Sequence, residues 1–431
     1  MNKVSCLLFV IMFAFSSYAQ EQWTLRDCVE KGKENSYKLM VASLTKSVAE
    51  KSKQSVASYY LPKVNLNGSQ GYNFGSAVDM STNSRVSSNI ATTQASVNTS
   101  LELFNWSNFV ENKQQQLLVD YAELSEQEVF YEYQSELLQL FFGIIGTQEF
   151  LKIQQQQYVN SEENFHRVRK EVEAGAKPQS DLYDIDFIFH NEKINIQQTE
   201  NDLNNQKMRL LHLLNVDSLS TSQITLVYQE EVIDLFTDYT FNPTLEKFRL
   251  NQMILEKDKQ LLRSSNLPYL SANYSFGSFY SRPFNTALDL DINAFSKQMG
   301  DNKSHSISLQ LTIPIFQGGN IIRKVKKKEE ELRLNEMRIK ESETGLLKQN
   351  QEINQEIEQL DLIAQQLSKG IELSQKSFIT TQVKYENGKA DIFSFNAAKN
   401  QMLSAQYALI KNNINRSLLV KRLQLNNTNM L

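Results

Sequence analysis

Two stretches of the chain alternate apolar and polar residues with a period of two. Residues 61–75 and 267–281 both begin with Leu-Pro, and each is followed by a second alternating stretch. This alternation is typical of a strand with one apolar and one polar face. It predicts four strands, over about 62–75, 92–104, 268–280 and 304–316.

The rest of the chain mostly predicts long helices. Residues 107–172 and 320–386 contain no proline, which is costly inside a helix, and a helix of that length would run ~100 Å. The second stretch places apolar residues in steps of four and three, the spacing of a coiled-coil seam, and the first repeats one every seven residues. The two seams are Ile353, Ile357, Leu360, Ala364, Leu367, Ile371, Ser374 and Phe378, and Phe130, Leu137, Ile144, Leu151 and Tyr158.

The two seams share a register, which indicates an internal duplication. A shift of 213 residues takes Ile144 to Ile357 and Gly175 to Gly388. A glycine just after a helix is a common C-terminal signal, so each glycine is predicted to end a long helix before a return helix. The predicted organisation is a first repeat over 20–215, an equatorial connector over 216–241, a second repeat over 242–425 and a tail over 426–431.

The N-terminus has the features of a secretory signal peptide. Residues 1–19 combine a positive start at Lys3, an apolar run and a small-x-small cleavage site. The apolar run is too short to span a membrane, and Cys6 lies too early in it for a lipid-attachment cysteine. The mature chain is therefore predicted to be exported and to retain only Cys28, which excludes an internal disulfide and a cysteine metal site.

The composition and motifs of the chain do not indicate an active site, a metal site or a nucleic-acid interface. The chain has 14 glycines and 6 prolines in 431 residues, few for a globular fold rich in turns. A net charge of -4 gives no basic footprint for nucleic acid, and the four histidines show no metal-ligand spacing. No phosphate-binding loop or nucleophile motif occurs. We expect no enzyme activity, no cofactor, no metal and no nucleic-acid partner.

Four amphipathic strands are too few to close a barrel, for which about eight is the practical minimum. Several copies could pool their strands into one barrel with the apolar face toward lipid, while the polar helices extend into water. Aromatic residues near the strand ends could then form interfacial girdles, the alternative for each being ordinary packing in the sheet. They are Tyr72, Phe74, Trp106, Tyr274, Phe276, Tyr280 and Phe316.

Three segments carry a family resemblance. They read IPIFQGGNIIRKV at 313–325, VEAGAKPQSDLYDID at 172–186 and VKYENGKADIFSFNAAKNQMLSAQ at 383–406. With the duplicated order of elements, they make nearly the whole mature chain resemble the TolC-like outer-membrane factor family. One departure is LELFNWSN at 101–108, which lacks the glycines of its second-half counterpart.

The resemblance implies a fold that is mainly α with transmembrane β. Three chains would form a 12-stranded β-barrel in the outer membrane of a Gram-negative bacterium, continued by a 12-helix α-barrel tunnel in the periplasm. Such a homotrimer is the exit duct of a tripartite efflux pump or a type I secretion system. Its expected partners are outer-membrane lipid, a periplasmic adaptor and an inner-membrane pump.

The resemblance also implies a constriction at the periplasmic tips. In the family, an aspartate after the first tip glycine meets a tyrosine before the second and a basic residue after it. Asp181 and Tyr385 hold the first two places, while Ala390 holds the basic one and Lys389 precedes it. An N-terminal helix acid favoured by the helix dipole is the alternative for Asp181. The candidate gate residues are Asp181, Tyr385, Lys389, Asp391 and Asn396, the last standing where the family can carry an acid.

The tips themselves are the expected adaptor-docking surface. The candidates there are Gly175, Ala176, Lys177, Gly388 and Ala390. By contrast, the charged run over 323–331 is expected to be a solvated helix face.

Two other classes compete with the exit duct. A periplasmic coiled-coil adaptor or scaffold also carries helical hairpins, but it would need more Gly-rich turns and would lack two repeated strand pairs. An exported enzyme ranks third, because no site residues converge. The sequence does not identify the transported substrate.

Overall fold

The computed structural model describes residues 21–79, 83–87, 89–216, 220–229, 241–284 and 293–428. The predicted signal peptide and part of the predicted connector lie outside these ranges. The chain divides into two compact units. We call Met1–Lys46, Glu123–Lys247 and Ile339–Leu431 the helical unit, and Ser47–Ala122 and Phe248–Arg338 the strand unit.

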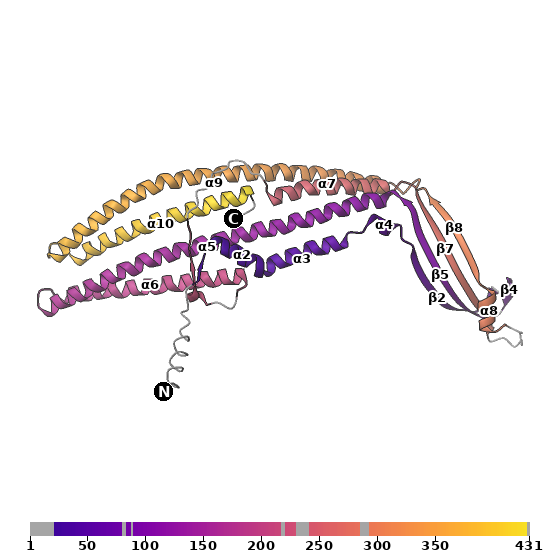
Figure 1. The fold of residues 1–431 in the computed structure, drawn as a ribbon, viewed down its shortest axis with the longest axis horizontal. Helices are drawn as coiled ribbons and strands as arrows, with labels where there is room; N and C mark the ends of the chain where they lie inside the picture. Colours follow the sequence, from indigo (N-terminus) through magenta and orange to yellow (C-terminus); the bar gives the residue numbers. More distant parts are fainter. Residues whose placement is uncertain are drawn as a thin grey trace, which may run out of the picture. The chain divides into compact units, whose positions relative to one another are not determined.

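The strand unit is built on one antiparallel sheet that joins both repeats. Its strand order is β2-β5-β7-β8, so the second strand of the first repeat pairs with the first strand of the second (Figure 1). Within the described residues, the outer edges of β2 and β8 pair with no further strand. The strands are β2 (Lys63–Asn73), β5 (Asn89–Asn105), β7 (Tyr269–Phe284) and β8 (Ser304–Thr312).

The pairing register puts apolar residues on one face and polar residues on the other. Leu66 is opposite Val97, which is opposite Phe276. In the adjacent row, Asn65, Asn98 and Ser275 are opposite one another. Directly opposed residues share a face, so the alternation predicted from the sequence is confirmed. The apolar face is open to the surroundings, since Leu66 is 78% exposed and Leu309 is 70% exposed.

A short helix that the sequence did not predict, α8 (Phe295–Asp301), covers part of one edge of β7. β8 begins opposite Gly277, so among the described residues no strand pairs with the last residues of β7 on that side. Buried Gln298 takes its place: its Oε1 accepts from Ser281 N at 3.0 Å and its Nε2 donates to Ser281 O at 3.2 Å. The side-chain amide thus supplies the hydrogen-bond partners that a neighbouring strand would otherwise give to this edge.

Two further features of the strand unit depart from the predictions. β8 ends at Thr312, so the strand predicted over 304–316 was too long. Pro314 lies in the excluded part, and proline has no N–H to donate to a ladder. A hairpin that was not predicted, β3 (Ser76–Asp79) with β4 (Ser84–Ser87), lies between β2 and β5.

The helices of the strand unit are joined by ion pairs. Besides α8, the unit contains α4 (Val56–Tyr59), most of α7 (Pro243–Ser264), the end of α3 (Tyr37–Ser52) and the first parts of α5 (Trp106–Glu173) and α9 (Asn320–Glu386); the ion pairs join α7 to α9. Lys328 Nζ lies 2.8 Å from Asp258 Oδ2, and Glu329 Oε1 lies 2.8 Å from Lys259 Nζ. The charged run over 323–331 is therefore only partly a solvated face, because two of its residues hold α9 to α7.

The helical unit contains most of two helical hairpins, which the sequence predicted. α5 (Trp106–Glu173) returns through α6 (Gln179–Leu214), and α9 returns through α10 (Ile392–Thr428) (Figure 1). The seams are the buried faces of the long helices. Leu137 and Ile144 are buried in the first hairpin, and Ile353 and Ile357 in the second.

The C-terminal tail predicted from residue 426 onward was placed too early. α10 continues to Thr428, and Asn426 and Asn427 are buried. Asn427 Oδ1 accepts from Asn350 Nδ2 at 2.8 Å, and Asn426 Nδ2 donates to Asn350 Oδ1 at 3.1 Å. These amide pairs hold the end of α10 against α9, which a solvated tail would not do.

A small parallel strand pair lies beside the core of the helical unit. β1 (Glu21–Trp23) pairs with β6 (Ile224–Leu226), in the connector where the sequence indicated β-like segments. The core around them includes Tyr133 and Leu214. The nearby helices are α2 (Leu25–Asn35) and a 3-10 helix (Thr221–Gln223), and α3 (Tyr37–Ser52) follows α2.

Cys28 lies in this core and is fully buried. Burial raises the pKa of its thiol to about 12. The single cysteine predicted for the mature chain is therefore a packing residue that stays protonated and unreactive.

Candidate functional site: the hairpin tips

Both hairpin tips are built by the same backbone motif. Gly175 N donates to Val172 O at 2.9 Å and Ala176 N donates to Glu171 O at 2.8 Å. Gly388 N and Lys389 N make the equivalent bonds, to Tyr385 O at 3.1 Å and Lys384 O at 2.7 Å. This is the Schellman cap, which needs a left-handed residue. The two glycines adopt φ values of 72° and 69°.

An apolar cluster packs the two tips together. Its buried members come from four helices: Val168 from α5, Ile185 from α6, Tyr385 from α9, and Ile392 and Phe395 from α10. The rings of Tyr385 and Phe395 stack with centroids 5.0 Å apart. The tips of the two repeats are thus one packed structure in a single chain.

Two cations lie over the face of Tyr385. Lys177 Nζ is 4.2 Å and Arg167 Cζ is 5.8 Å from the ring centroid, within the usual range for cation–π attraction. Burial raises the pKa of the Tyr385 hydroxyl above its ordinary value, and the charge of Asp181 acts in the same direction. Lys177 and Arg167 oppose that shift. The phenol stays neutral at physiological pH.

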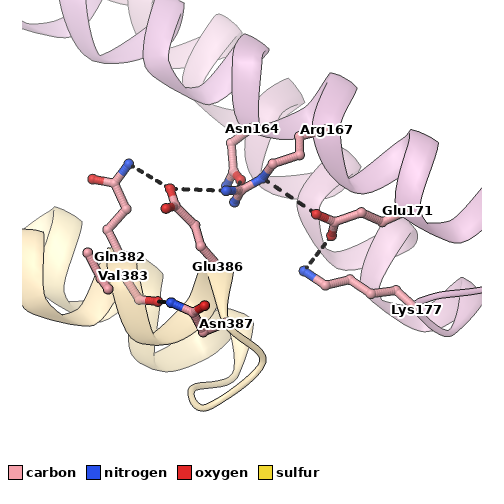
Figure 2. A network of polar contacts seen from close by, with 8 residues as sticks. All are labelled: Asn164, Arg167, Glu171, Lys177, Gln382, Val383, Glu386 and Asn387. Atoms are coloured by element: carbon pink, nitrogen blue, oxygen red, sulfur yellow. Dashed lines mark hydrogen bonds and ion pairs between the residues drawn. The ribbon is translucent and has the colours of Figure 1, made fainter.

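A set of polar contacts joins the two hairpins beside this cluster (Figure 2). We call it the clasp, and it consists of Asn164 and Arg167 on α5 with Gln382 and Glu386 on α9. Arg167 Nη1 on α5 lies 3.0 Å from Glu386 Oε1 on α9. Gln382 Nε2 donates to the same carboxylate oxygen at 3.1 Å, and Asn164 Oδ1 accepts from Arg167 Nη2 at 2.5 Å. On the side of the first tip, Lys177 Nζ lies 3.0 Å from Glu171 Oε2.

A polar cavity of ≈ 270 Å³ lies behind the clasp, between the hairpins. Its charged residues have both signs, so their formal charges largely cancel. Its wall includes Asn160, Ser161, Glu163, Asn164, Arg167, Phe378, Gln382, Glu386, Phe395 and Lys399.

Of the predicted gate residues, Tyr385 lies at the centre of this arrangement and Asp181 lies close enough to influence its pKa. Asp391 instead caps α10, where its Oδ1 accepts from Ser394 N at 2.6 Å. Asn396 donates to Ile392 O of its own helix at 2.9 Å. Lys389 is exposed and contributes its backbone N–H to the second cap.

The predicted docking residues divide into exposed and packed ones. Gly175, Ala176 and Gly388 are exposed at the turns. Lys177 is largely covered by its contacts with Glu171 and Tyr385, and Ala390 packs against the tip cluster. Only the first group presents a free surface in the single chain.

The predicted aromatic girdle residues lie in the strand unit. Trp106 and Phe316 follow the strands at the end where the long helices begin, while Tyr72, Phe74 and Tyr280 lie toward the other end. Two residues do not fit this description. Tyr274 and Phe276 lie in the middle of β7 and pack around His305, to whose Nδ1 the Tyr274 hydroxyl is bonded at 2.9 Å.

Sequence reasoning missed most of the polar residues that join the hairpins. Arg167, Glu171 and Glu386 were not singled out, nor was buried Lys399. A partial signal was present in Arg167 and Glu171, which lie four residues apart in the last turns of a helix. Their partner Glu386 belongs to the other repeat, and no local pattern links the two.

Among the described residues, no three His, Cys, Asp or Glu side chains are placed to hold a metal ion. None of the described helices is both long and apolar enough to cross a membrane.

Comparison with known proteins agrees with this fold. The model of the outer membrane efflux protein family matches residues 29–216 and 241–425. No curated protein sequence is detectably similar. The crystal structure of the Campylobacter jejuni CmeC outer membrane channel is similar, with a TM-score of 0.75 at 15% identity, over 94% of this chain and 90% of that one. The outer membrane protein VceC from Vibrio cholerae gives 0.74 at 12% identity, over 93% and 95%.

Proposed function

Because the chain belongs to the outer membrane efflux protein family, and so forms the outer-membrane exit duct of an efflux system, we propose that three copies assemble into a channel gated at the hairpin tips. The trimer places its pooled strands in the outer membrane of a Gram-negative bacterium and its hairpins in the periplasm. There a periplasmic adaptor and an inner-membrane pump meet the tips. The chain is a passive conduit for small molecules or secreted polypeptides.

The observation that carries the assembly is the unfinished sheet of the strand unit. Four strands leave two unpaired edges in the described residues and one exposed apolar face. Unpaired strand edges do not face lipid, because their backbone groups would lack partners there. Joining β8 of one copy to β2 of the next satisfies both edges, and three copies give 12 strands.

The proposed gate rests on the clasp and the cations over Tyr385. Arg167 and Glu386 hold α5 to α9, and their side chains are 34% and 37% exposed. Water can replace each partner when the hairpins separate, so such a pair is worth only up to about 1 kcal/mol. An adaptor that binds the tip opens it by replacing this pair and separating the apolar tip cluster beside it.

Assembly is tested by reconstituting the purified mature protein in planar bilayers, with oligomer size and membrane fraction measured alongside. A heat-resistant trimer in the outer-membrane fraction with discrete conductance steps is expected. A soluble periplasmic species without channels would refute the proposal and favour a periplasmic coiled-coil adaptor or scaffold.

The gate is tested by the single-channel conductance of Glu386→Gln and Asp181→Ala. In Glu386→Gln, loss of the ion pair to Arg167, worth up to about 1 kcal/mol, raises the open fraction up to about fivefold. Asp181→Ala should also raise it. Glu352→Gln is the matched control, because it removes an exposed glutamate from the same helix away from the tip. Open fractions equal to that of the control in both gate variants would eliminate the proposed gate while leaving the channel itself intact.

A further inference from the structure

Away from the tips, contacts between α5 and α10 form a seam that joins the two hairpins of one chain. The helices are antiparallel, so contacts that lie later on α5 lie earlier on α10. Tyr131 donates to Asn426 Oδ1 at 2.6 Å. Beyond it, Gly146 lies against Ile414, and the rings of Phe150 and Tyr407 are 4.3 Å apart.

Nearer the tips, this seam contains one buried charge. The Lys399 side chain on α10 is only 3% exposed, and its Nζ lies 2.6 Å from Glu192 Oε1 on α6. The same ammonium donates to Ser161 Oγ on α5, which is also buried. One side chain of the second hairpin is therefore bonded to both helices of the first.

The contacts on the two sides of Lys399 differ in their response to water. Toward the tips lie the clasp pair, which is about one-third exposed, and the apolar tip cluster, and separating either leaves no buried charge without a partner. At Lys399 the ammonium and Ser161 are buried, and Glu192, at 20% exposed, is less exposed than either member of the clasp pair. A charge that loses its partner in such a place is strongly unfavourable, so the hairpins separate more easily on the tip side of Lys399 than across it.

We propose that Lys399, with Glu192 and Ser161, is the pivot at which separation of the two hairpins stops. Opening moves the tips and leaves the seam beyond Lys399 closed. Lys399 lies seven residues into the body of α10 from Ile392, about 10 Å along the helix. The pivot rests on the proposed gating function, since it sets how far along the chain the gate opens.

The test measures how fast cysteines on either side of the pivot react with N-ethylmaleimide. Val168→Cys reports on the tip side and Ile414→Cys on the opposite side, each introduced separately into the Cys28→Ser trimer. With Lys399 intact, the gate variant Glu386→Gln should speed alkylation at 168 severalfold and leave the rate at 414 unchanged. Adding Lys399→Met should raise the rate at 414 severalfold as well.

Three variants separate the pivot from general destabilisation. Lys399→Arg keeps the charge and should keep the rate at 414 low, and Lys411→Met removes an exposed lysine from the same helix and should have no effect. Glu192→Gln is measured in place of Lys399→Met if the latter fails to assemble.

The pivot is overturned if the rate at 414 is the same with and without Lys399. It is equally overturned if Glu386→Gln alone raises that rate together with the rate at 168. The proposed gate is judged separately, by the conductance of Glu386→Gln, so failure of one does not decide the other.

Discussion

At the scale of single residues, the exposure of each charge at the tips decides what it can do. Arg167 and Glu386 meet across the hairpins while remaining about one-third exposed, whereas Lys399 is buried and its partner Glu192 is 20% exposed. The same kinds of group thus make a contact that water can replace in one place and a fixed one in the other.

Asp391 is a helix cap whose charge persists well into the acid range. The hydrogen bond from Ser394 N lowers the pKa of this carboxyl below its ordinary value of 3.8. Its contribution is therefore fully present above pH 3.8 and is lost as the pH falls through the lower folded-state pKa. Asp391→Ala should speed amide hydrogen exchange in the first turn of α10 at neutral pH.

The control for this cap is Asp391→Asn, whose side-chain oxygen can still accept from Ser394 N. It should exchange at close to the wild-type rate. If Asp391→Asn speeds exchange as much as Asp391→Ala, the negative charge is what matters and not the capping hydrogen bond. The charge would then act through another contact, such as a partner in the gate.

At the scale of elements, the two Schellman turns set where the hairpins reverse. Gly175 and Gly388 hold positive φ angles, and a Cβ at either position would meet no atom within 4 Å. The cost of alanine there is consequently confined to the backbone, about 1–2 kcal/mol for each residue. Gly175→Ala and Gly388→Ala should each lower the thermal midpoint of the trimer.

Gly370→Ala provides a matched comparison within α9. This glycine also has open space around it, but it lies inside the helix and has no positive φ. Alanine should stabilise the helix there by about 0.8–1.0 kcal/mol. Equal changes in thermal midpoint at positions 370 and 388 would contradict the backbone argument.

At the scale of the whole molecule, the proposed barrel places the apolar face of the sheet against lipid and the polar face toward the lumen. Leu309 lies on the exposed apolar face and its neighbour Gln310 on the polar face. An arginine at the middle of the lipid-facing side of a barrel costs about 2–4 kcal/mol, and one in the lumen does not. Leu309→Arg should therefore reduce the heat-resistant trimer in outer membranes, while Gln310→Arg should leave it near wild type.

The outcome is read from trimer yield in isolated membranes at matched expression. Similar yields for both arginine variants would mean that the apolar face does not contact lipid. That result would contradict the proposed transmembrane barrel even if the protein were trimeric.

Much of the fold follows from repeating patterns in the sequence. Period-two alternation located β2, β5, β7 and β8, and heptad spacing located the buried faces of α5 and α9. Such patterns can be recognised from a few neighbouring residues, so they predict an element without knowledge of what it packs against. The duplication also aligned the glycines of the two tip turns, because a left-handed residue at that point is usually glycine or one of its few substitutes.

Other elements needed contacts that no local pattern records. α8 exists where Gln298 satisfies the backbone of Ser281, and the end of α10 is ordered by Asn350. In both cases the decisive partner lies outside the element, so a reading confined to its own sequence placed no helix or ended one early.

The sequence by itself therefore determined the strands, the long helices, the glycine turns and the duplicated order, because each depends on local backbone preference and a regular spacing of apolar residues. Only the tertiary structure decided which charges meet. Lys399 and Glu192 are separated by 207 positions in the sequence, and Arg167 and Glu386 belong to different repeats. Their pairing depends on how two hairpins pack in space, and on which side chains that packing withdraws from water.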